Sequence, residues 1–169
     1  FLDYAKPSKG DPRPTDVNLA LDRTAHFIRP ECQAVGTELT VELDPELPLV
    51  RIDLEQFRQV LLNLTQNALQ AMEGGGSLRL ETARVMRAGE AWAEIAVRDT
   101  GPGITDDVLP KLFVPFVTTK ERGTGLGLAL SQRIIAAAGG RILVRTRLGK
   151  GTTFLVRLPG SVERTSRVE

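Results

Sequence analysis

Three alternating glycines, Gly123, Gly125 and Gly127, stand immediately before an apolar helical pattern and could form a phosphate-binding turn. Glycine permits positive φ and a close approach of the backbone to a ligand, and the following helix offers unpaired N–H groups to an anion. Lys120 and Arg122 add cationic side chains just before the glycines. Because similar turns precede many ordinary helices, the phosphate interpretation requires a base pocket and a metal ligand elsewhere in the chain.

A carboxylate, Asp99, occupies a position that the strand pattern predicts to be buried. Ala93, Ile95 and Val97 alternate with more polar residues, and this alternation places Asp99 on the apolar face. Burying an unpaired charge is costly, so the carboxylate needs donors. Two sources remain open: the N–H groups of the turn at 100–103, or a ligand amine such as N6 of adenine.

An amide-rich stripe on a predicted helix offers a candidate metal ligand. The helix begins at Asp53, and Gln59, Asn63, Asn67 and Gln70 share a face beside its apolar stripe. A solvated surface accounts for the two glutamines. Asparagine is a poor helix former, and two asparagines one turn apart in mid-helix cost stability. An amide oxygen facing a hydrated Mg²⁺ would explain them.

The composition indicates one globular domain without general affinity for nucleic acid or membrane. The 169 residues are 41% hydrophobic and 25% charged, with a formal net charge of +1. No apolar run reaches the length of a membrane span, and the N-terminus lacks a signal-peptide core, so no direct membrane contact is expected. The single cysteine, Cys32, continues an apolar helical stripe and fits a buried side chain in a reducing, cytoplasmic compartment.

The N-terminal residues are predicted to be the end of a helix followed by a linker. Pro7, Pro12 and Pro14 oppose regular structure there, and a start within a helix indicates a preceding helical domain. The expected organisation is a dimerisation-helix end and linker at 1–14, a folded domain at 15–160 and a flexible tail at 161–169.

Apolar periodicity then predicts alternating helices and strands. The first helix is expected to begin at Asp16 or Asn18 and to leave His26, the only histidine, in solvent. Further helices are predicted at 53–72, from Thr105 onward and at 128–138, and strands at 37–43, 50–52, 78–82, 93–99, 142–146 and 154–158. Strands with one apolar face predict a two-layer α/β sandwich, a mixed and mostly antiparallel sheet with helices on one face. A Rossmann or Walker site is excluded by context: the glycines at 123–127 follow no strand, and Gly149-Lys150 leads into one.

The segment between 112 and 127 has no period and is predicted to be a functional lid. Residues 117–124 offer little to bury, so their order is expected to depend on nucleotide. Phe113 and Phe116 are expected to stay docked in the core as the fixed end of the lid.

Four motifs resemble, in order, those of a known domain. They are Asn-Leu-Thr-Gln-Asn-Ala at 63–68, Asp-Thr-Gly-Pro-Gly at 99–103, Leu-Phe-Val-Pro-Phe at 112–116 and Gly-Thr-Gly-Leu-Gly at 123–127. They are similar to the N box, first glycine box, F box and second glycine box of the catalytic and ATP-binding domain of bacterial sensor histidine kinases. This domain belongs to the superfamily of gyrase, chaperone, kinase and mismatch-repair ATPases, with a Bergerat-type ATP-binding fold. Segments 1–7 and 113–120 are similar to the nitrogen-regulation type of sensor kinase.

The resemblance implies ATP and Mg²⁺ as cofactors. Asp99 would accept a hydrogen bond from the adenine amine, Gly103 would let the base lie close, and Asn67 would bind Mg²⁺. Lys120 would neutralise charge on the γ-phosphoryl group. The other implied binding residues are Gly101, Arg122, Gly123, Thr124, Gly125, Leu126, Gly127 and Thr153. Thr153 matches the threonine that supports the aspartate in relatives, and Thr152 is the competing candidate.

Asn63 bears on the type of reaction. Hydrolytic members of the superfamily carry a water-activating glutamate one turn before the magnesium asparagine, whereas an amide cannot accept a proton at neutral pH. The sequence therefore favours phosphoryl transfer, which needs mainly positioning and charge neutralisation. Asn63 and Lys120 are the candidate catalytic residues.

The acceptor histidine expected from the resemblance is absent, because His26 does not match its motif. The implied partners are a histidine-bearing dimerisation domain of the same protein, a response regulator and, for the full-length protein, a second copy in a homodimer. Two other functions stay open: a serine kinase of the anti-sigma class and a module that binds nucleotide without catalysis.

Overall fold

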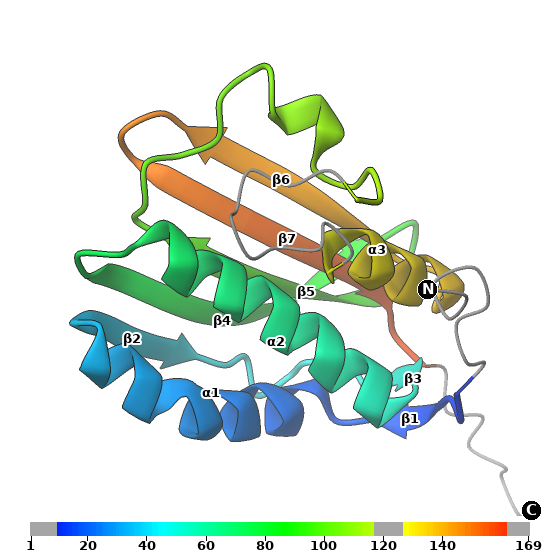
Figure 1. Ribbon diagram of the computed structural model, residues 1–169. Coiled ribbons are helices and arrows are strands. Elements are labelled where there is room, and N and C mark those ends of the chain that lie inside the picture. Colours follow the sequence, from blue (N-terminus) through cyan, green and yellow to red (C-terminus); the bar gives the residue numbers. More distant parts are fainter. Residues whose placement is uncertain (1–9, 117–126, 162–169) are drawn as a thin grey trace, which may run out of the picture.

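A five-stranded sheet forms one layer of the computed structural model, which describes residues 10–116 and 127–161 (Figure 1). Its strand order is β2-β4-β5-β7-β6, with bounds Thr37–Glu42, Gly76–Arg87, Glu90–Asp99, Gly151–Pro159 and Arg141–Arg147. β2 and β4 are parallel, and the remaining neighbours are antiparallel. The predicted mixed, mostly antiparallel sheet is therefore confirmed.

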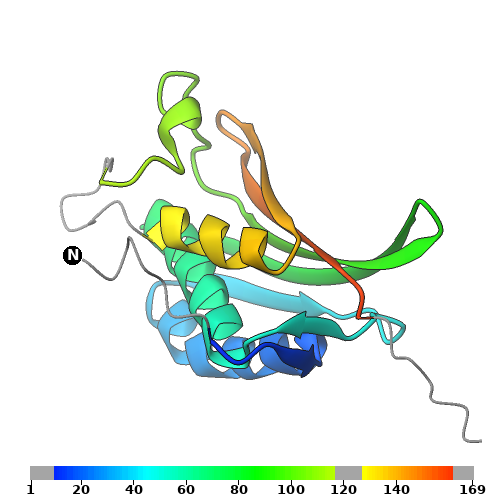
Figure 2. The same cartoon turned by 90° about the vertical axis from the view of Figure 1, so that its right-hand side faces the viewer.

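Three helices form the second layer and cover one face of the sheet, as the two views show (Figures 1 and 2). They are α1 (Val17–Ala34), α2 (Leu54–Ala71) and α3 (Gly127–Ala137). Asp16 and Asp53 cap α1 and α2 by accepting hydrogen bonds from Leu19 N–H at 3.1 Å and Gln56 N–H at 2.9 Å. Both predicted helix starts are confirmed. No helix within the described ranges is long and apolar enough to span a bilayer.

The core lies between the helices and the sheet. On β5, Ala93, Ile95 and Val97 are fully buried, and Val97 lies opposite Leu80 of β4 and Phe154 of β7. The helices contribute Leu21, Ile28, Cys32, Phe57, Leu61, Leu64 and Ile135. This arrangement follows from the period of two in the strands and the helical spacing of the apolar residues.

A second, two-stranded sheet lies beside the start of α2. β1 (Arg13–Thr15) pairs antiparallel with β3 (Val50–Ile52), and Pro14 lies opposite Arg51. The expectation that residues 1–14 lack regular structure is therefore wrong at Arg13 and Pro14. Proline is tolerated because β1 is an edge strand, whose outward N–H positions need no partner.

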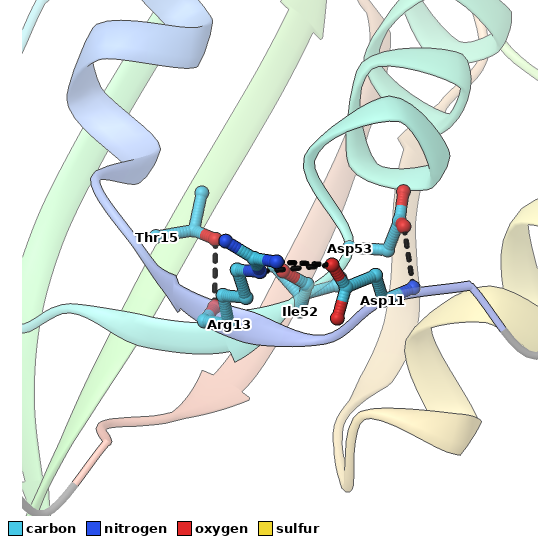
Figure 3. Close-up of polar contacts among 5 residues, drawn as sticks. All are labelled: Asp11, Arg13, Thr15, Ile52 and Asp53. Atoms are coloured by element: carbon cyan, nitrogen blue, oxygen red, sulfur yellow. Dashed lines mark hydrogen bonds and ion pairs between the residues drawn. The ribbon is translucent and has the colours of Figure 1, made fainter.

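Residues 10–15, here called the N-terminal strap, are tied to the start of α2 (Figure 3). The backbone N–H of Asp11 donates to Asp53 Oδ2 at 2.7 Å, and the Thr15 hydroxyl donates to the Ile52 carbonyl at 2.9 Å. Arg13 forms an exposed ion pair with Asp11 at 2.8 Å. One carboxylate, that of Asp53, thus binds both the helix start and the strap.

Two local predictions are wrong. Thr105 begins a turn rather than an α-helix, and the only helical turn that follows before residue 117 is the 3₁₀ helix η1 (Leu109–Lys111). Phe113 is half-buried against the core, but Phe116 is 62% exposed with φ of 66°. The backbone therefore turns at Phe116 in a conformation that directs the side chain out of the core.

Candidate functional site

The candidate site is organised by Asp99, the last residue of β5. Its side chain is 9% exposed, as its place on the apolar face predicts. Oδ1 accepts hydrogen bonds from Gly101 N–H at 2.9 Å and from Thr152 N–H at 3.3 Å. These are the only donors to the carboxylate that the described residues provide, so Oδ2 keeps its acceptor capacity.

Burial raises the pKa of Asp99 above its ordinary value, and the N–H groups of Gly101 and Thr152 offset part of that effect. Both donor sources predicted for Asp99, the N–H groups of the turn and a ligand amine, are therefore compatible with its environment. The turn and the neighbouring strand satisfy Oδ1, while Oδ2 can accept from a ligand. A carboxylate that is buried and only half satisfied is typical of a binding site.

Thr152, and not Thr153, supports Asp99. The register pairs Asp99 with Thr152 and Arg98 with Thr153, so Thr153 lies on the opposite face of the sheet. Thr152 is also the more buried of the two, at 5% exposure. The assignment of Thr153 is therefore corrected by one position, which in a strand exchanges the two faces.

The turn after Asp99 lies close against the surrounding backbone. A Cβ at Gly101 would come within 3.0 Å of Asp99 Oδ1 and 3.1 Å of the Ala71 carbonyl of α2. Gly103 has φ of 83°, and a Cβ there would come within 2.6 Å of the Arg147 carbonyl. Position 103 therefore requires glycine and position 101 leaves little room for a side chain, so the backbone of the turn lies close beside the carboxylate.

Asn63 and Asn67 stand one turn apart on α2, on the side that meets α3. The Asn63 side-chain amide donates to the Gly127 carbonyl at 3.1 Å and to the Ser131 hydroxyl at 3.2 Å. Asn67 is half-buried one turn nearer to Asp99 along the helix. The glutamines on the same stripe, Gln59 and Gln70, are exposed, as predicted.

Six predicted phosphate-binding residues lie outside the described residues: Lys120, Arg122, Gly123, Thr124, Gly125 and Leu126. The lid expected at 117–124 lies outside them as well. Gly127 is described and is the first residue of α3. Its carbonyl accepts from Asn63, so the start of α3 is fixed directly by the amide stripe of α2.

Several residues at the site have no signal in the sequence. Ser131 of α3 is fully buried and accepts from Asn63, and Thr146 of β6 accepts from the N–H of Ile104 at 2.9 Å. A single Ser or Thr within an apolar pattern does not indicate a site until the neighbouring elements have been placed. His26, by contrast, is exposed on α1, as predicted.

A surface hollow lies beside the site but does not include Asp99. A hollow of about 440 Å³ runs along α2 and is lined by Glu55, Gln56, Arg58, Gln59, Leu62 and Asn63. It adjoins the amide stripe but not Asp99, so the site is assigned by chemistry and not by this hollow. Within residues 10–116 and 127–161, no three His, Cys, Asp or Glu side chains are grouped to hold a metal ion.

Comparison with known proteins gives concordant similarities. Residues 52–162 match the family described as "Histidine kinase-, DNA gyrase B-, and HSP90-like ATPase". Over 159 residues the chain is 37% identical to the signal transduction histidine-protein kinase AtoS of Escherichia coli (strain K12), covering 94% of this chain and 26% of AtoS. The chain thus spans about a quarter of that relative's length.

Solved structures are similar over nearly all of the chain. Full-length ShkA in complex with AMPPNP has a TM-score of 0.82 at 30% identity, covering 95% of this chain and 35% of ShkA. The histidine kinase ThkA, in complex with the response regulator protein TrrA, has a TM-score of 0.73 at 25% identity, covering 89% of this chain and 42% of ThkA.

Proposed function

The chain belongs to the family of histidine kinase-, DNA gyrase B- and HSP90-like ATPases, and from this premise we propose that it is the ATP-binding catalytic domain of a two-component sensor histidine kinase. It would transfer the γ-phosphoryl group of ATP to a histidine on a separate dimerisation domain. AtoS and ThkA are histidine kinases, and ShkA was solved in complex with AMPPNP, which favours this function over a serine kinase.

The observation that carries the proposal is the half-satisfied carboxylate of Asp99. Oδ1 is held by two backbone N–H groups and lies against Gly101, in a turn with little room for side chains at 101 and 103, which leaves Oδ2 to accept from a ligand. The adenine ring, with its N6 amine, fits this combination: the amine donates to Oδ2 while the base lies flat on the glycine turn. A 6-oxo purine would instead direct an acceptor at the carboxylate, so the site favours adenine over guanine.

The metal and phosphates are assigned to the neighbouring amide stripe. Asn67 provides a neutral amide oxygen, a ligand type that Mg²⁺ accepts together with phosphate oxygens and water. When bound, Mg²⁺ would neutralise phosphate charge during transfer. Lys120, Arg122 and the glycine-rich residues 123–127 remain the proposed phosphate contacts. Because Gly127 is fixed to α2 through Asn63, that segment has a defined anchor on its C-terminal side.

Phosphoryl transfer is proposed rather than hydrolysis. The Asn63 amide uses its N–H₂ group on Gly127 and Ser131, and amides do not act as general bases at neutral pH. The chain's own residues would thus bind and orient the nucleotide while the proton chemistry is left to the incoming histidine.

The partners follow from the same proposal. Residues 1–14 would join the domain at 15–160 to the dimerisation domain, and the full-length kinase would act as a cytoplasmic-facing homodimer that passes phosphate to a response regulator. The complex of ThkA with a response regulator supports this last step. Residues 161–169 are proposed to be a tail outside the catalytic domain.

The test combines binding with transfer. Calorimetric titration should show that ATP with Mg²⁺ binds and that GTP binds much more weakly. The chain should not label itself with γ-labelled ATP, whereas adding a histidine-bearing dimerisation domain of a related kinase should yield acid-labile phosphate on that domain. Binding without transfer to the domain would support a nucleotide-binding module, and acid-stable phosphate would indicate a serine kinase.

A further inference from the structure

Thr146 of β6 joins two parts of the site that are distant in sequence. Its hydroxyl accepts a hydrogen bond from Ile104 N–H at 2.9 Å, and it lies 2.9 Å from the Thr152 hydroxyl and 3.2 Å from the Gly151 carbonyl. One hydroxyl thus contacts both the end of the glycine turn and the strand residue next to Asp99.

Hydrogen bonds join the glycine turn that follows Asp99 to the β6–β7 hairpin. Gly149 N–H donates to the Pro102 carbonyl at 2.8 Å, and Ile104 N–H donates to Thr146. Between these bonds, Gly103 lies against the Arg147 carbonyl too closely for any side chain. Among the residues that the structure describes, Thr146 therefore supplies one of two hydrogen bonds that hold the 102–104 backbone against the hairpin.

Thr146 is also connected to the Asp99 carboxylate, through Thr152. Thr152, which shares the hydroxyl contact, donates its backbone N–H to Asp99 Oδ1 at 3.3 Å and is 5% exposed. Thr146 lies directly opposite Thr152 in the β6–β7 register. The 102–104 backbone and the Asp99 carboxylate are consequently linked through this threonine pair, in addition to the direct bond from Gly101 N–H to Oδ1.

We propose that Thr146 is a positioning residue for purine selectivity: it fixes the glycine turn relative to Asp99, so that a bound base must align its 6-substituent with Oδ2. This inference rests on the proposed adenine site and adds a residue that does not itself touch the nucleotide. Without the hydroxyl, Ile104 N–H loses its acceptor, and the turn can move away from the carboxylate. The base then has alternative positions, and water reaches the polar contact that distinguishes an amine from a carbonyl.

ADP and IDP test the proposal directly, because they differ only in the amine or carbonyl at position 6 and in the hydrogen that the 6-oxo base carries on the adjacent N1. In calorimetric titrations of the full chain, Thr146→Val should weaken ADP binding by about tenfold, as expected for one lost hydrogen bond. It should weaken IDP less, so the preference for ADP over IDP shrinks. Thr146→Ser, which keeps the hydroxyl, should restore the wild-type preference.

The controls separate positioning from a general loss of structure. Thr40→Val makes the same change on β2, far along the sheet from Asp99, and should leave both affinities unchanged. If Thr146→Val does not fold, Thr146→Ala removes the hydroxyl without placing a methyl group against Ile104 N–H and serves for the same comparison.

The outcomes for the two proposals differ. A wild-type chain that binds ADP and IDP equally would overturn the proposed adenine site itself. If the wild type prefers ADP and the hydroxyl-free variants keep that preference in full, the adenine site stands and the role of Thr146 is wrong. A reduced preference that serine restores supports Thr146 as the positioning residue.

Discussion

The side-chain amide of Asn63 lies 3.1 Å from the carbonyl of Gly127, so the middle of α2 holds the first residue of α3. A second bond from the same amide reaches the buried Ser131 hydroxyl at 3.2 Å. A residue selected from the sequence for its possible chemistry therefore also has a structural role, because it joins two helices that are distant in the chain.

Asn63→Ala should lower the free energy of unfolding by about 1–2 kcal/mol, because two partly buried hydrogen bonds are lost. Urea denaturation of the nucleotide-free chain measures this change. Gln59→Ala, one turn earlier on the same stripe and exposed, is the matched control and should be close to neutral. Equal effects of the two substitutions would contradict the structural role of Asn63.

Asp99→Asn should stabilise the nucleotide-free domain while weakening adenine binding. Burial raises the pKa of Asp99 in the folded state, so folding becomes less favourable as the pH rises from the ordinary carboxyl range through the raised value. An amide removes this penalty and can still accept from Gly101 and Thr152, but its N–H₂ group faces the adenine amine.

Thermal unfolding at pH 7 and at pH 4 would check the prediction for Asp99. The stabilisation by asparagine should be larger at pH 7, and ATP affinity should fall by roughly ten- to a hundredfold, as for a lost bond to a charged acceptor. A variant that is less stable than wild type at pH 7 would show that the carboxylate is not penalised by burial. Unchanged ATP affinity would remove Asp99 from the adenine site.

Asn67→Ala should remove the magnesium-dependent part of nucleotide binding and leave the metal-independent part unchanged. Titrations with ATP in Mg²⁺ and in EDTA provide the two values for each chain. Gln70→Ala, exposed near the end of the same helix, is the control that should respond to Mg²⁺ as the wild type does. If chelation changes the affinity of the Asn67 variant as much as that of the wild type, Asn67 is not the ligand.

Asp53→Ala should destabilise the domain by about 1–2 kcal/mol, because α2 loses its N-cap and Asp11 loses its acceptor. The N–H groups of Asp11 and Gln56 lower the pKa of Asp53, so its contribution is present above the ordinary carboxyl range and is lost as the pH falls through the lowered value. The difference in melting temperature between wild type and variant should accordingly be constant near neutral pH and shrink in acid.

A matched variant distinguishes the two tasks of Asp53. Asp53→Asn can still cap α2 through its amide oxygen, but its N–H₂ group cannot accept from Asp11. Its stability should lie between those of wild type and alanine. An asparagine variant equal to wild type at neutral pH would mean that the bond to the N-terminal strap contributes nothing.

Most of the fold could be predicted from local patterns in the sequence. The alternation along β5 correctly predicted that Asp99 is buried, and the aspartates at 16 and 53 correctly marked two helix starts. These predictions succeeded because burial period and capping depend on neighbouring residues only.

The errors concern positions whose environment is set by segments distant in the sequence. Thr153 was chosen from the motif match, and the pairing of β5 with β7 places Thr152 instead opposite Asp99. Pro14 forms part of a strand because β3 offers it an edge, and Thr146 matters only because Ile104 lies beside it. Such contacts depend on tertiary pairing, which local composition does not encode.

The parallel pair β2–β4 has a consequence for the order of folding. The antiparallel hairpins β4–β5 and β6–β7 close through short turns, whereas β2 can join β4 only after β3 and α2 have crossed between them. Because loop closure must precede these distant contacts, we expect β2 and α1 to join the sheet after the hairpins have formed. Hydrogen exchange would then detect the earliest opening at the β2 edge, which is the edge farthest in strand order from Thr146 on β6.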